Sequence, residues 1–355
     1  MENKKVKVVL VAPSLKNVGG QSIQAKRLLD AFAGDEEIDL EFVANDSRAP
    51  FQHIKFARTI FASIKFWLRL LARIPKADVV HVFSSGTTSY IISTLPPLFV
   101  SKIFGKKTIL HYHTGEAETH LENWKLTAKP TMKWFNAIVV PSQFLVDVFG
   151  KFDLKAKAIF NFVDGEQFGF RTRKPLRPIF LSNRNFERHY NVGDVLHAFR
   201  LIQDQIPEAR LLIAGGGSEE AKLKKLAAEL KLENTEFLGR IEHSEMPAIY
   251  AKADIYLNSS VVDNMPLSII EAFSCGLPVV SYATGGISYI SKNRETALLV
   301  GKNDCEALAR AALSLLEDQE AAEKIIDRAK RECEKYSPEN VRSSWREIYR
   351  RPGKI

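Results

Sequence analysis

The chain alternates between short apolar runs and stretches in which apolar residues recur at helical spacing. The first half contains six such runs, each with the length and composition of a buried strand. The predicted strands are 7–12, 40–43, 79–83, 108–113, 137–140 and 158–161, and the clearest predicted helices are 21–33, 53–74, 118–135 and 142–150. Alternation of strand and helix indicates a parallel sheet covered by helices.

The same pattern starts again after residues 165–177, which combine glycine, proline and scattered charge and are interpreted as a linker. The second set of predicted strands is 178–182, 209–214, 235–239, 254–258, 278–281 and 297–300. We therefore predict an α/β protein with two doubly wound, Rossmann-like domains, 1–164 and 178–337. A last helix within 338–355 is suited to cross back to the first domain. Ligands of such sheets bind at the carboxyl ends of the strands, so a central cleft between the domains is the expected site.

Composition is that of an ordinary globular protein, with 355 residues of which 45% are hydrophobic and 26% charged. The three cysteines, Cys275, Cys305 and Cys333, are far apart, which argues against a disulfide framework and favours a cytoplasmic location. The N-terminal apolar run is too short for a signal peptide. Val79–Ser101 is uncharged, but it is too polar and too interrupted by proline to span a membrane.

Positive charge is concentrated in the first half, where residues 1–164 carry 22 Lys and Arg against 15 Asp and Glu. Residues 51–74 contain five cations and no acid, and at about 100° per residue these cations fall within an arc of roughly 80°. The cations are Lys55, Arg58, Lys65, Arg69 and Arg73, and the opposite side carries Ile60, Ile64, Trp67, Leu68 and Leu71. Such a helix is suited either to docking on an anionic membrane surface or to packing in the core with a basic outer face. Nucleic acid is not favoured as a partner, because no binding motif is recognisable.

Two acids flank the predicted start of a helix in the second half. Asp263 and Glu271 are eight residues apart, with Pro266 between them in a position that suits the first turn. The N–H groups of Asn264, Met265, Leu267 and Ser268 lie at the positive end of the helix dipole, which favours a diphosphate. An acid on either side of that site could hold sugar hydroxyls and a ribose. By spacing alone, an ordinary helix with an Asp near its N-cap explains both acids more simply.

The segment DNMPLSIIEAFSCGLPVV, from Asp263 to Val280, resembles glycosyltransferase family 4, whose members have the two-domain GT-B fold. That family shows two Glu separated by seven residues, in a pattern like E-x-F-G-x-P-x-x-x-E-A-x-A-x-G-x-P-V-V followed by a Gly-Gly turn. The matching residues are Pro266, Glu271, Ala272, Gly276, Pro278, Val279, Val280, Gly285 and Gly286. The sequence departs at Asp263, which is one methylene shorter than the usual Glu, and at Tyr289, where another Glu is common.

The resemblance implies transfer of a hexosyl group from a nucleoside diphosphate sugar, such as a UDP-sugar, to an acceptor hydroxyl with retention of configuration. The product would be a glycan, polysaccharide or glycolipid, and the acceptor a glycan or a lipid-linked molecule. The first domain would then lie on the acceptor side and the second would bind the donor. Glu271 would bind the ribose and Asp263 the donor sugar. The backbone contacts to sugar and diphosphate would come from Asn264, Met265, Pro266 and Leu267. No metal or other cofactor is implied.

Two further side chains fit this resemblance. His113, in LHYHTGE, matches a histidine beside the donor sugar, and His111 is the second choice. Arg184, in SNRNFERHYNV, matches an arginine that neutralises the diphosphate, a role suited to its forked guanidinium. His113, Asp263 and Arg184 are therefore the candidate catalytic residues.

The usual lysine after this arginine is missing. Depending on the gap, Arg188, His189 or Tyr190 takes its place, and Arg188 would supply a cation. The remaining candidate donor contacts are backbone contacts from four glycines, Gly19, Gly20, Gly216 and Gly239.

Two alternatives remain open on the sequence. One is a nucleotide-sugar epimerase of the same fold, which would isomerise the donor without an acceptor. The other is a catalytically weak sugar-nucleotide-binding protein, suggested by Asp263 and by the missing lysine.

Overall fold

The computed structural model describes residues 5–16, 19–46, 55–84, 86–163 and 167–353, with side chains from Phe61 onward in the helix that begins at Lys55. The chain divides into two compact units, unit 1 (1–162 with 338–355) and unit 2 (163–337). Each unit contains a six-stranded sheet whose neighbouring strands all run parallel. The predicted fold class, two helix-covered parallel sheets, is confirmed.

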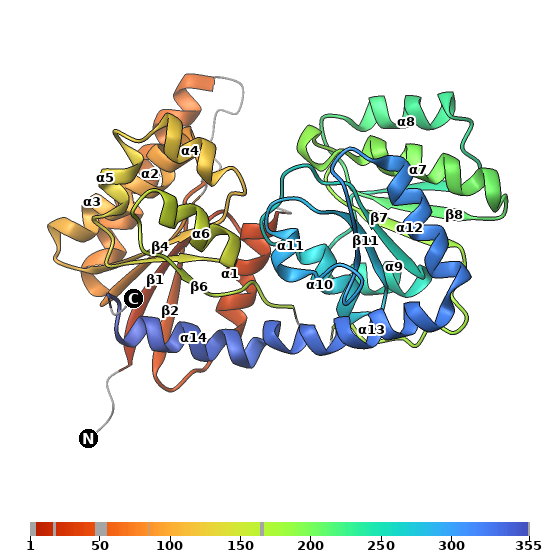
Figure 1. Ribbon diagram of the computed structural model, residues 1–355. Helices are drawn as coiled ribbons and strands as arrows, with labels where there is room; N and C mark the ends of the chain where they lie inside the picture. Colours follow the sequence, from red (N-terminus) through yellow and green to blue (C-terminus); the bar gives the residue numbers. More distant parts are fainter. Residues whose placement is uncertain (1–4, 17–18, 47–54, 85, 164–166, 354–355) are drawn as a thin grey trace. The chain divides into compact units, whose positions relative to one another are not determined.

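The sheet of unit 1 has the strand order β2-β1-β3-β4-β5-β6. Its strands are β1 (Val6–Ala12), β2 (Ile38–Ala44), β3 (Val79–Ser84), β4 (Lys107–Tyr112), β5 (Ala137–Val140) and β6 (Lys157–Ala158). Its helices are α1 (Gly20–Ala31), α2 (Lys55–Arg73), η1 (Ile74–Lys76), η2 (Tyr90–Thr94), α3 (Leu95–Ile103), α4 (Ala117–Asn123), α5 (Ala128–Met132), α6 (Gln143–Lys151) and α14 (Pro338–Arg350). Successive side chains of a strand point to opposite faces. Val9 and Val11 of β1 accordingly pack with α2 to α6, whereas Val8 and Leu10 pack with α1 and α14 (Figure 1).

A buried carboxylate fixes α14 to unit 1. Asp35 accepts hydrogen bonds from Arg342 and Arg346, at 2.6 Å each, and from the backbone N–H groups of Glu37 and Ile38. Burial alone would raise the pKa of Asp35, but these four donors outweigh it and hold the pKa well below its usual range. The last helix of the sequence is therefore an integral part of the first unit.

Two elements of unit 1 are shorter than the sequence pattern predicts. The helix expected over 118–135 is interrupted by turns at 124–127, which leave α4 and α5 on either side. Of the strand expected over 158–161, only Ala158 lies in β6 and pairs with β5. The chain then leaves the sheet edge and buries Ile159 and Phe162 against α14. Apolar periodicity does not distinguish a buried connection from a strand, which explains this error.

The sheet of unit 2 has the strand order β12-β11-β10-β7-β8-β9. Its strands are β7 (Ile179–Asn183), β8 (Arg210–Ala214), β9 (Thr235–Gly239), β10 (Ile255–Asn258), β11 (Val279–Tyr282) and β12 (Leu298–Val300). Its helices are η3 (Arg188–Tyr190), α7 (Val192–Gln205), α8 (Glu220–Glu229), α9 (Met246–Lys252), α10 (Leu267–Ser274), α11 (Ile287–Ile290), α12 (Cys305–Glu317), α13 (Gln319–Cys333) and η4 (Glu334–Tyr336). Helices α7, α8, α12 and α13 pack on one face, and the strand order reverses between β7 and β10. Such a reversal opens a crevice at the carboxyl ends of the two strands, where ligands bind in doubly wound folds.

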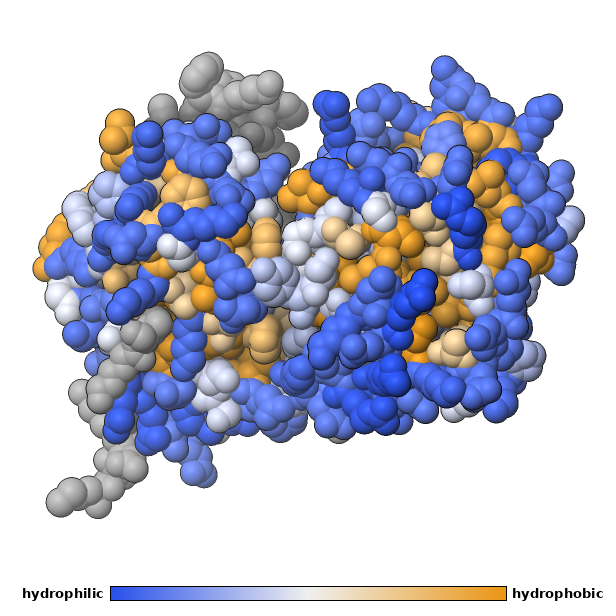
Figure 2. Space-filling model, in the orientation of Figure 1, coloured by the Kyte–Doolittle hydropathy of each residue, from blue (hydrophilic) through white to orange (hydrophobic). Residues whose placement is uncertain are grey.

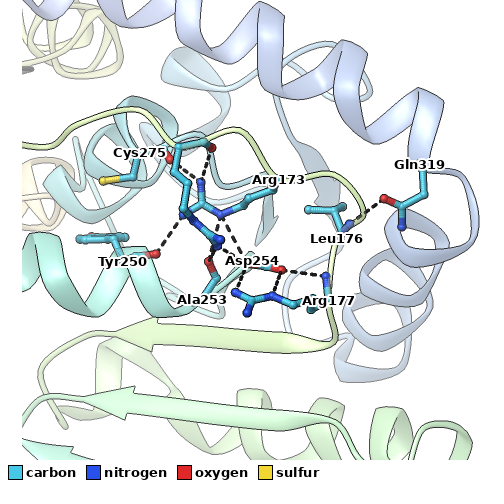
Figure 3. A network of polar contacts seen from close by, with 9 residues as sticks. Arg173, Leu176, Arg177, Tyr250, Ala253, Asp254, Cys275 and Gln319 are labelled. Atoms are coloured by element: carbon cyan, nitrogen blue, oxygen red, sulfur yellow. Dashed lines mark hydrogen bonds and ion pairs between the residues drawn. The ribbon is translucent and has the colours of Figure 1, made fainter.

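Residues 167–177, in the segment predicted to be a linker, are held firmly on unit 2 (Figure 3). Asp254 is buried and accepts hydrogen bonds from Arg171 and Arg177. The fully buried Arg173 lies 3.7 Å from the same carboxylate and donates to backbone carbonyl oxygens, including those of Ala253 and Cys275. Burial lowers the pKa of Arg173 to about 10. The three arginines therefore form a structural cluster around one buried carboxylate.

Candidate active site

A largely enclosed cation, whose side chain is 10% exposed, lies at the carboxyl end of β7. Arg184 directly follows this strand, and its guanidinium donates hydrogen bonds to the Asp263 carboxylate and, at 3.1 Å, to Ser268 Oγ. The guanidinium carbon also lies 4.1 Å from the centre of the Tyr190 ring, which is the geometry of a cation–π contact. Burial by itself lowers the pKa of Arg184, but the Asp263 carboxylate outweighs it and raises the pKa. Arg184 is therefore a permanent positive charge held in a fixed orientation.

The Asp263 loop joins this cation to the start of α10. The loop leaves β10 at the same point of strand reversal, and its residues Asn264 and Met265 are buried. Asp263 accepts a hydrogen bond from the backbone N–H of Asn264 at 2.9 Å. Pro266 is the N-cap of α10, one residue before the helix begins at Leu267. The structure thus brings Arg184, Asp263 and the N-terminus of α10 together.

Glycines allow the backbone of this loop to be packed closely. A Cβ atom at Gly286 would lie 1.7 Å from the carbonyl oxygen of Asn264, and one at Gly285 would lie 2.2 Å from that of Asp263. The Gly286 N–H donates to the Asp263 carbonyl at 3.0 Å. Gly215 has the same function beside Arg184, because a Cβ atom at Gly215 would lie 2.1 Å from the Arg184 carbonyl oxygen. Both Gly-rich turns therefore fix the backbone that carries the charged pair.

Both carboxylate oxygens of Glu271 have side-chain partners. Oε1 lies 2.9 Å from His243 Nε2, and Oε2 lies 3.1 Å from the Tyr250 hydroxyl. The Tyr250 hydroxyl also accepts a hydrogen bond from Asn183, the last residue of β7. Burial, with a smaller contribution from Glu271, raises the pKa of Tyr250 well above its usual value. Glu271 is thus held beside the same strand end as Arg184.

The sequence alone does not place His243 or Tyr250 in the site. It leaves Tyr190 as one of three candidates to replace the missing lysine. His243 lies in the loop after β9, 28 residues before Glu271, and Tyr250 lies within α9, 21 residues before it. Only the rule that loops after parallel strands converge could have indicated them. Of the three candidates for the missing lysine, Tyr190 contacts Arg184, whereas the side chains of Arg188 and His189 are exposed.

The predicted glycines of unit 2 lie at strand ends in the same sheet. Gly239 ends β9 with a positive φ of 70°, and its carbonyl accepts a hydrogen bond from Gly215 at 2.8 Å. Gly216 lies against the side chain of Arg240, so that a Cβ atom there would be 2.8 Å from it. These turns line the carboxyl edge of the sheet.

Unit 1 carries the remaining predicted residues. Gly19 caps α1 and Gly20 is its first residue; among the described residues, none beyond the chain neighbours has an atom within 4 Å of a Cβ atom at either glycine. His113 follows β4, and its backbone N–H donates a hydrogen bond to the Ser84 carbonyl oxygen at 3.0 Å. The side-chain amide of Gln21 donates to the same oxygen at 3.5 Å. The structure therefore brings His113 and the glycine loop together at the end of β3.

A row of histidines extends from His113 to the C-terminal helix. The ring centres of His113 and His111 are 4.0 Å apart. His111 Nδ1 lies 3.1 Å from His81 Nε2, and His81 Nδ1 lies 2.8 Å from the Tyr349 hydroxyl. Burial lowers the pKa of His113 to about 3 and that of the other two well below the usual value. All three are neutral at pH 7, so His113 can donate or accept a hydrogen bond but carries no charge.

Lowering the pH from about 7 to about 5 is expected to destabilise unit 1. The folded chain keeps His81, His111 and His113 neutral, whereas the unfolded chain protonates them near pH 6.5. The unfolded state thus binds more protons below that pH, and the free energy of unfolding falls by about 1.4 kcal/mol per pH unit for each such histidine. Urea unfolding followed by tryptophan fluorescence measures this effect, because all four tryptophans lie in unit 1. An unfolding free energy that does not fall between these pH values would contradict the burial of the histidines.

Within the described part of the chain, no group of three or more His, Cys, Asp or Glu side chains is arranged to hold a metal ion.

Residues 165–332 match the family described as glycosyl transferases group 1. The sulfoquinovosyl transferase of Arabidopsis thaliana is 27% identical over 288 residues, which are 74% of this chain and 54% of that protein. The poly(glycerol-phosphate) alpha-glucosyltransferase of Bacillus subtilis is 30% identical over 203 residues, 52% of this chain and 30% of that protein. The chain thus spans about half the length of such relatives, or less.

Solved structures show the same fold. Sucrose-phosphate synthase from Thermosynechococcus elongatus superposes with a TM-score of 0.82 at 20% identity, covering 98% of both chains. Anabaena HepE in complex with UDP-glucose superposes with a TM-score of 0.77 at 15% identity, covering 96% of this chain and 98% of that one. These solved structures show the fold of the chain, and the glycosyl transferase group 1 match covers residues 165–332 within it.

Proposed function

We propose that this protein transfers a hexosyl group from a nucleoside diphosphate sugar to an acceptor hydroxyl, with retention of the anomeric configuration. The observation that carries the proposal is the Arg184–Asp263 pair at the N-terminus of α10, whose side chains are 10% and 11% exposed, with the buried Glu271 further along that helix. This arrangement offers a cation and helix N–H groups to a diphosphate, and a carboxylate on either side to hydroxyl groups.

Arg184 would exchange one anionic partner for another when the donor binds. In the structure its charge is compensated by Asp263. A diphosphate at the start of α10 would compete for the same guanidinium and leave Asp263 free to accept a hydrogen bond from a sugar hydroxyl. As the glycosidic bond breaks, negative charge develops on the diphosphate, and a fixed cation there stabilises the transition state. Tyr190 would keep the guanidinium in place during this exchange.

Glu271 is proposed to bind the ribose of the nucleotide through its two oxygens. His243 and Tyr250 occupy those oxygens in the structure, and they would reorient or share the carboxylate with ribose hydroxyls. The proposed donor is a UDP-sugar, as in the HepE complex. The acceptor is proposed to be a glycan or a lipid-linked molecule, since the relatives include a poly(glycerol-phosphate) glucosyltransferase. In unit 1, His113, Gly19 and Gly20 are proposed to contact the sugar or the acceptor through uncharged hydrogen bonds.

Replacing Glu271 with Ala is expected to weaken donor binding by about ten- to a hundredfold, because hydrogen bonds to a charged group contribute about 1.5–3 kcal/mol. Isothermal titration with UDP-, GDP- and ADP-sugars measures the dissociation constants and identifies the base. Glu306→Ala, at an exposed position of α12, is the matched control and should leave binding unchanged.

If no nucleotide sugar binds to the folded protein, the proposal is wrong. If Glu271→Ala binds donor as tightly as the parent chain, the ribose site lies elsewhere. Conversion of the donor to its epimer without any acceptor would instead identify the epimerase alternative.

A further inference from the structure

Helix α2 is packed on unit 1 by a narrow apolar stripe. Phe66 and Leu70 of this helix are buried in the hydrophobic core, and so is Ile74, which directly follows the helix. They recur every four residues, which places them on one face of the helix. An ordinary surface helix presents polar side chains on the opposite face.

The face of α2 that points away from the core is apolar instead. Ile64, Leu68 and Leu71 are 50%, 62% and 46% exposed, and Trp67 beside them is 39% exposed. At about 100° per residue, Ile64, Leu68 and Leu71 lie roughly 130° from the centre of the buried stripe. The wide apolar arc of the sequence is therefore divided, with one part in the core and the other in solvent.

The neighbouring helix α3 packs beside α2 and carries exposed apolar side chains of its own. Ile92 in η2 and Phe99 and Ile103 in α3 are exposed and recur at helical spacing along this continuous stretch. The Phe99 ring meets the exposed Trp134 ring edge-on at 5.9 Å. Figure 2 shows orange, hydrophobic surface at the left edge of this unit. We call this surface the apolar patch, defined by Ile64, Leu68, Leu71, Ile92, Phe99, Ile103 and Trp134.

The same part of the chain is strongly basic. Residues 61–107 contain seven Lys and Arg and a single acid, Asp78. Lys65 stands on α2 between the exposed stripe and the flank of the helix, and Lys102 and Lys107 bracket the end of α3. Burial, and to a smaller extent the positive charge of Lys107, lower the pKa of Lys102. Apolar side chains with a basic border match the boundary between lipid headgroups and acyl chains.

We propose that the apolar patch docks unit 1 on the surface of an anionic lipid bilayer. Its aliphatic and aromatic side chains would enter the headgroup region, and its lysines would pair with lipid phosphates. A protein partner fits less well, because the central parts of protein interfaces are depleted of lysine. No described helix is long and apolar enough to cross a membrane, and docking on one leaflet requires none. This proposal is independent of the catalytic proposal, since it concerns a different surface.

Vesicle flotation tests the proposal on the full chain. Phosphatidylcholine vesicles, with and without about one-third phosphatidylglycerol, separate the anionic contribution from the apolar one. The parent chain should float with the anionic vesicles and only weakly with the neutral ones. The variant Ile64→Ser/Leu68→Ser/Leu71→Ser should lose binding by about tenfold or more, because it removes the aliphatic groups that enter the bilayer. Leu68→Trp should retain or strengthen binding, since tryptophan favours the interface.

Two charge-reversal variants complete the test. Lys65→Glu/Lys102→Glu should reduce binding to anionic vesicles, whereas Lys224→Glu/Lys225→Glu on α8 of unit 2 should not. Thermal unfolding midpoints should be unchanged in all variants, because the substituted side chains are exposed. No flotation of the parent chain, equal flotation on neutral vesicles, or equal loss in both charge variants would overturn the proposal. So would a parent chain that forms dimers disrupted by the triple serine variant and does not bind vesicles.

Discussion

Replacing Arg184 with Ala is expected to lower kcat/KM by about 10²- to 10³-fold, the effect of removing one fixed donor that stabilises negative charge in a transition state. Arg184 contacts Asp263, Ser268 and Tyr190 together at the start of α10. Its loss removes the proposed diphosphate contact and leaves Asp263 without its cation. Steady-state kinetics with the donor identified by titration measures the change.

Graded variants separate charge from geometry at this position. Arg184→Lys keeps a positive charge but lacks the planar fork, so its loss should be intermediate. Tyr190→Phe keeps the aromatic ring and should stay close to the parent, whereas Tyr190→Ala should weaken donor binding. Arg210→Ala, at the amino end of β8, is the matched control on the other edge of the sheet. Full turnover in Arg184→Ala would show that the diphosphate binds elsewhere.

Replacing Asp254 with Ala is expected to destabilise unit 2 by about 3–5 kcal/mol, the usual effect of leaving a buried charge without its partner. The substitution removes the acceptor shared by Arg171 and Arg177 and leaves the buried Arg173 without a neighbouring carboxylate. Chemical unfolding followed by far-ultraviolet circular dichroism should show a transition that moves to lower denaturant.

The tryptophans make this prediction specific to one unit. Because all four lie in unit 1, the fluorescence transition should move much less than the dichroism transition. Asp327→Ala, at an exposed position of α13, is the control and should change neither. If Asp254→Ala unfolds like the parent chain, the arginine cluster has no important structural function.

The sequence predicted the sheets well because buried parallel strands are nearly continuous apolar runs. The run 79–83 is an example, since every residue of β3 is buried. The arginines of 165–177 were harder to interpret. They resemble surface charge in a linker, and their partner Asp254 stands about eighty residues further along the chain. Side-chain pairs of such separation are determined by the tertiary fold and leave no local pattern.

The candidate site was predictable where the chain carries a contiguous motif. The loop that contains Asp263 leads into α10, which carries Glu271, and Arg184 lies beside Asp263. The partners of Glu271 were not predicted, because His243 and Tyr250 reach it only through the convergence of separate loops. For the helix over 51–74, periodicity indicated a wide apolar arc. Only burial shows that Leu68 and Leu71 face away from the core.

The most direct test of the central claim is analysis of the reaction product. The protein is incubated with the nucleotide sugar that binds most tightly and with glycan or lipid-linked acceptors, and the anomeric proton of the product is followed by NMR. We predict a new glycoside whose anomeric configuration is the same as that of the donor, formed by the parent chain and strongly reduced in Glu271→Ala. A product of inverted configuration, or no transfer by a folded protein that binds the donor, would contradict the account.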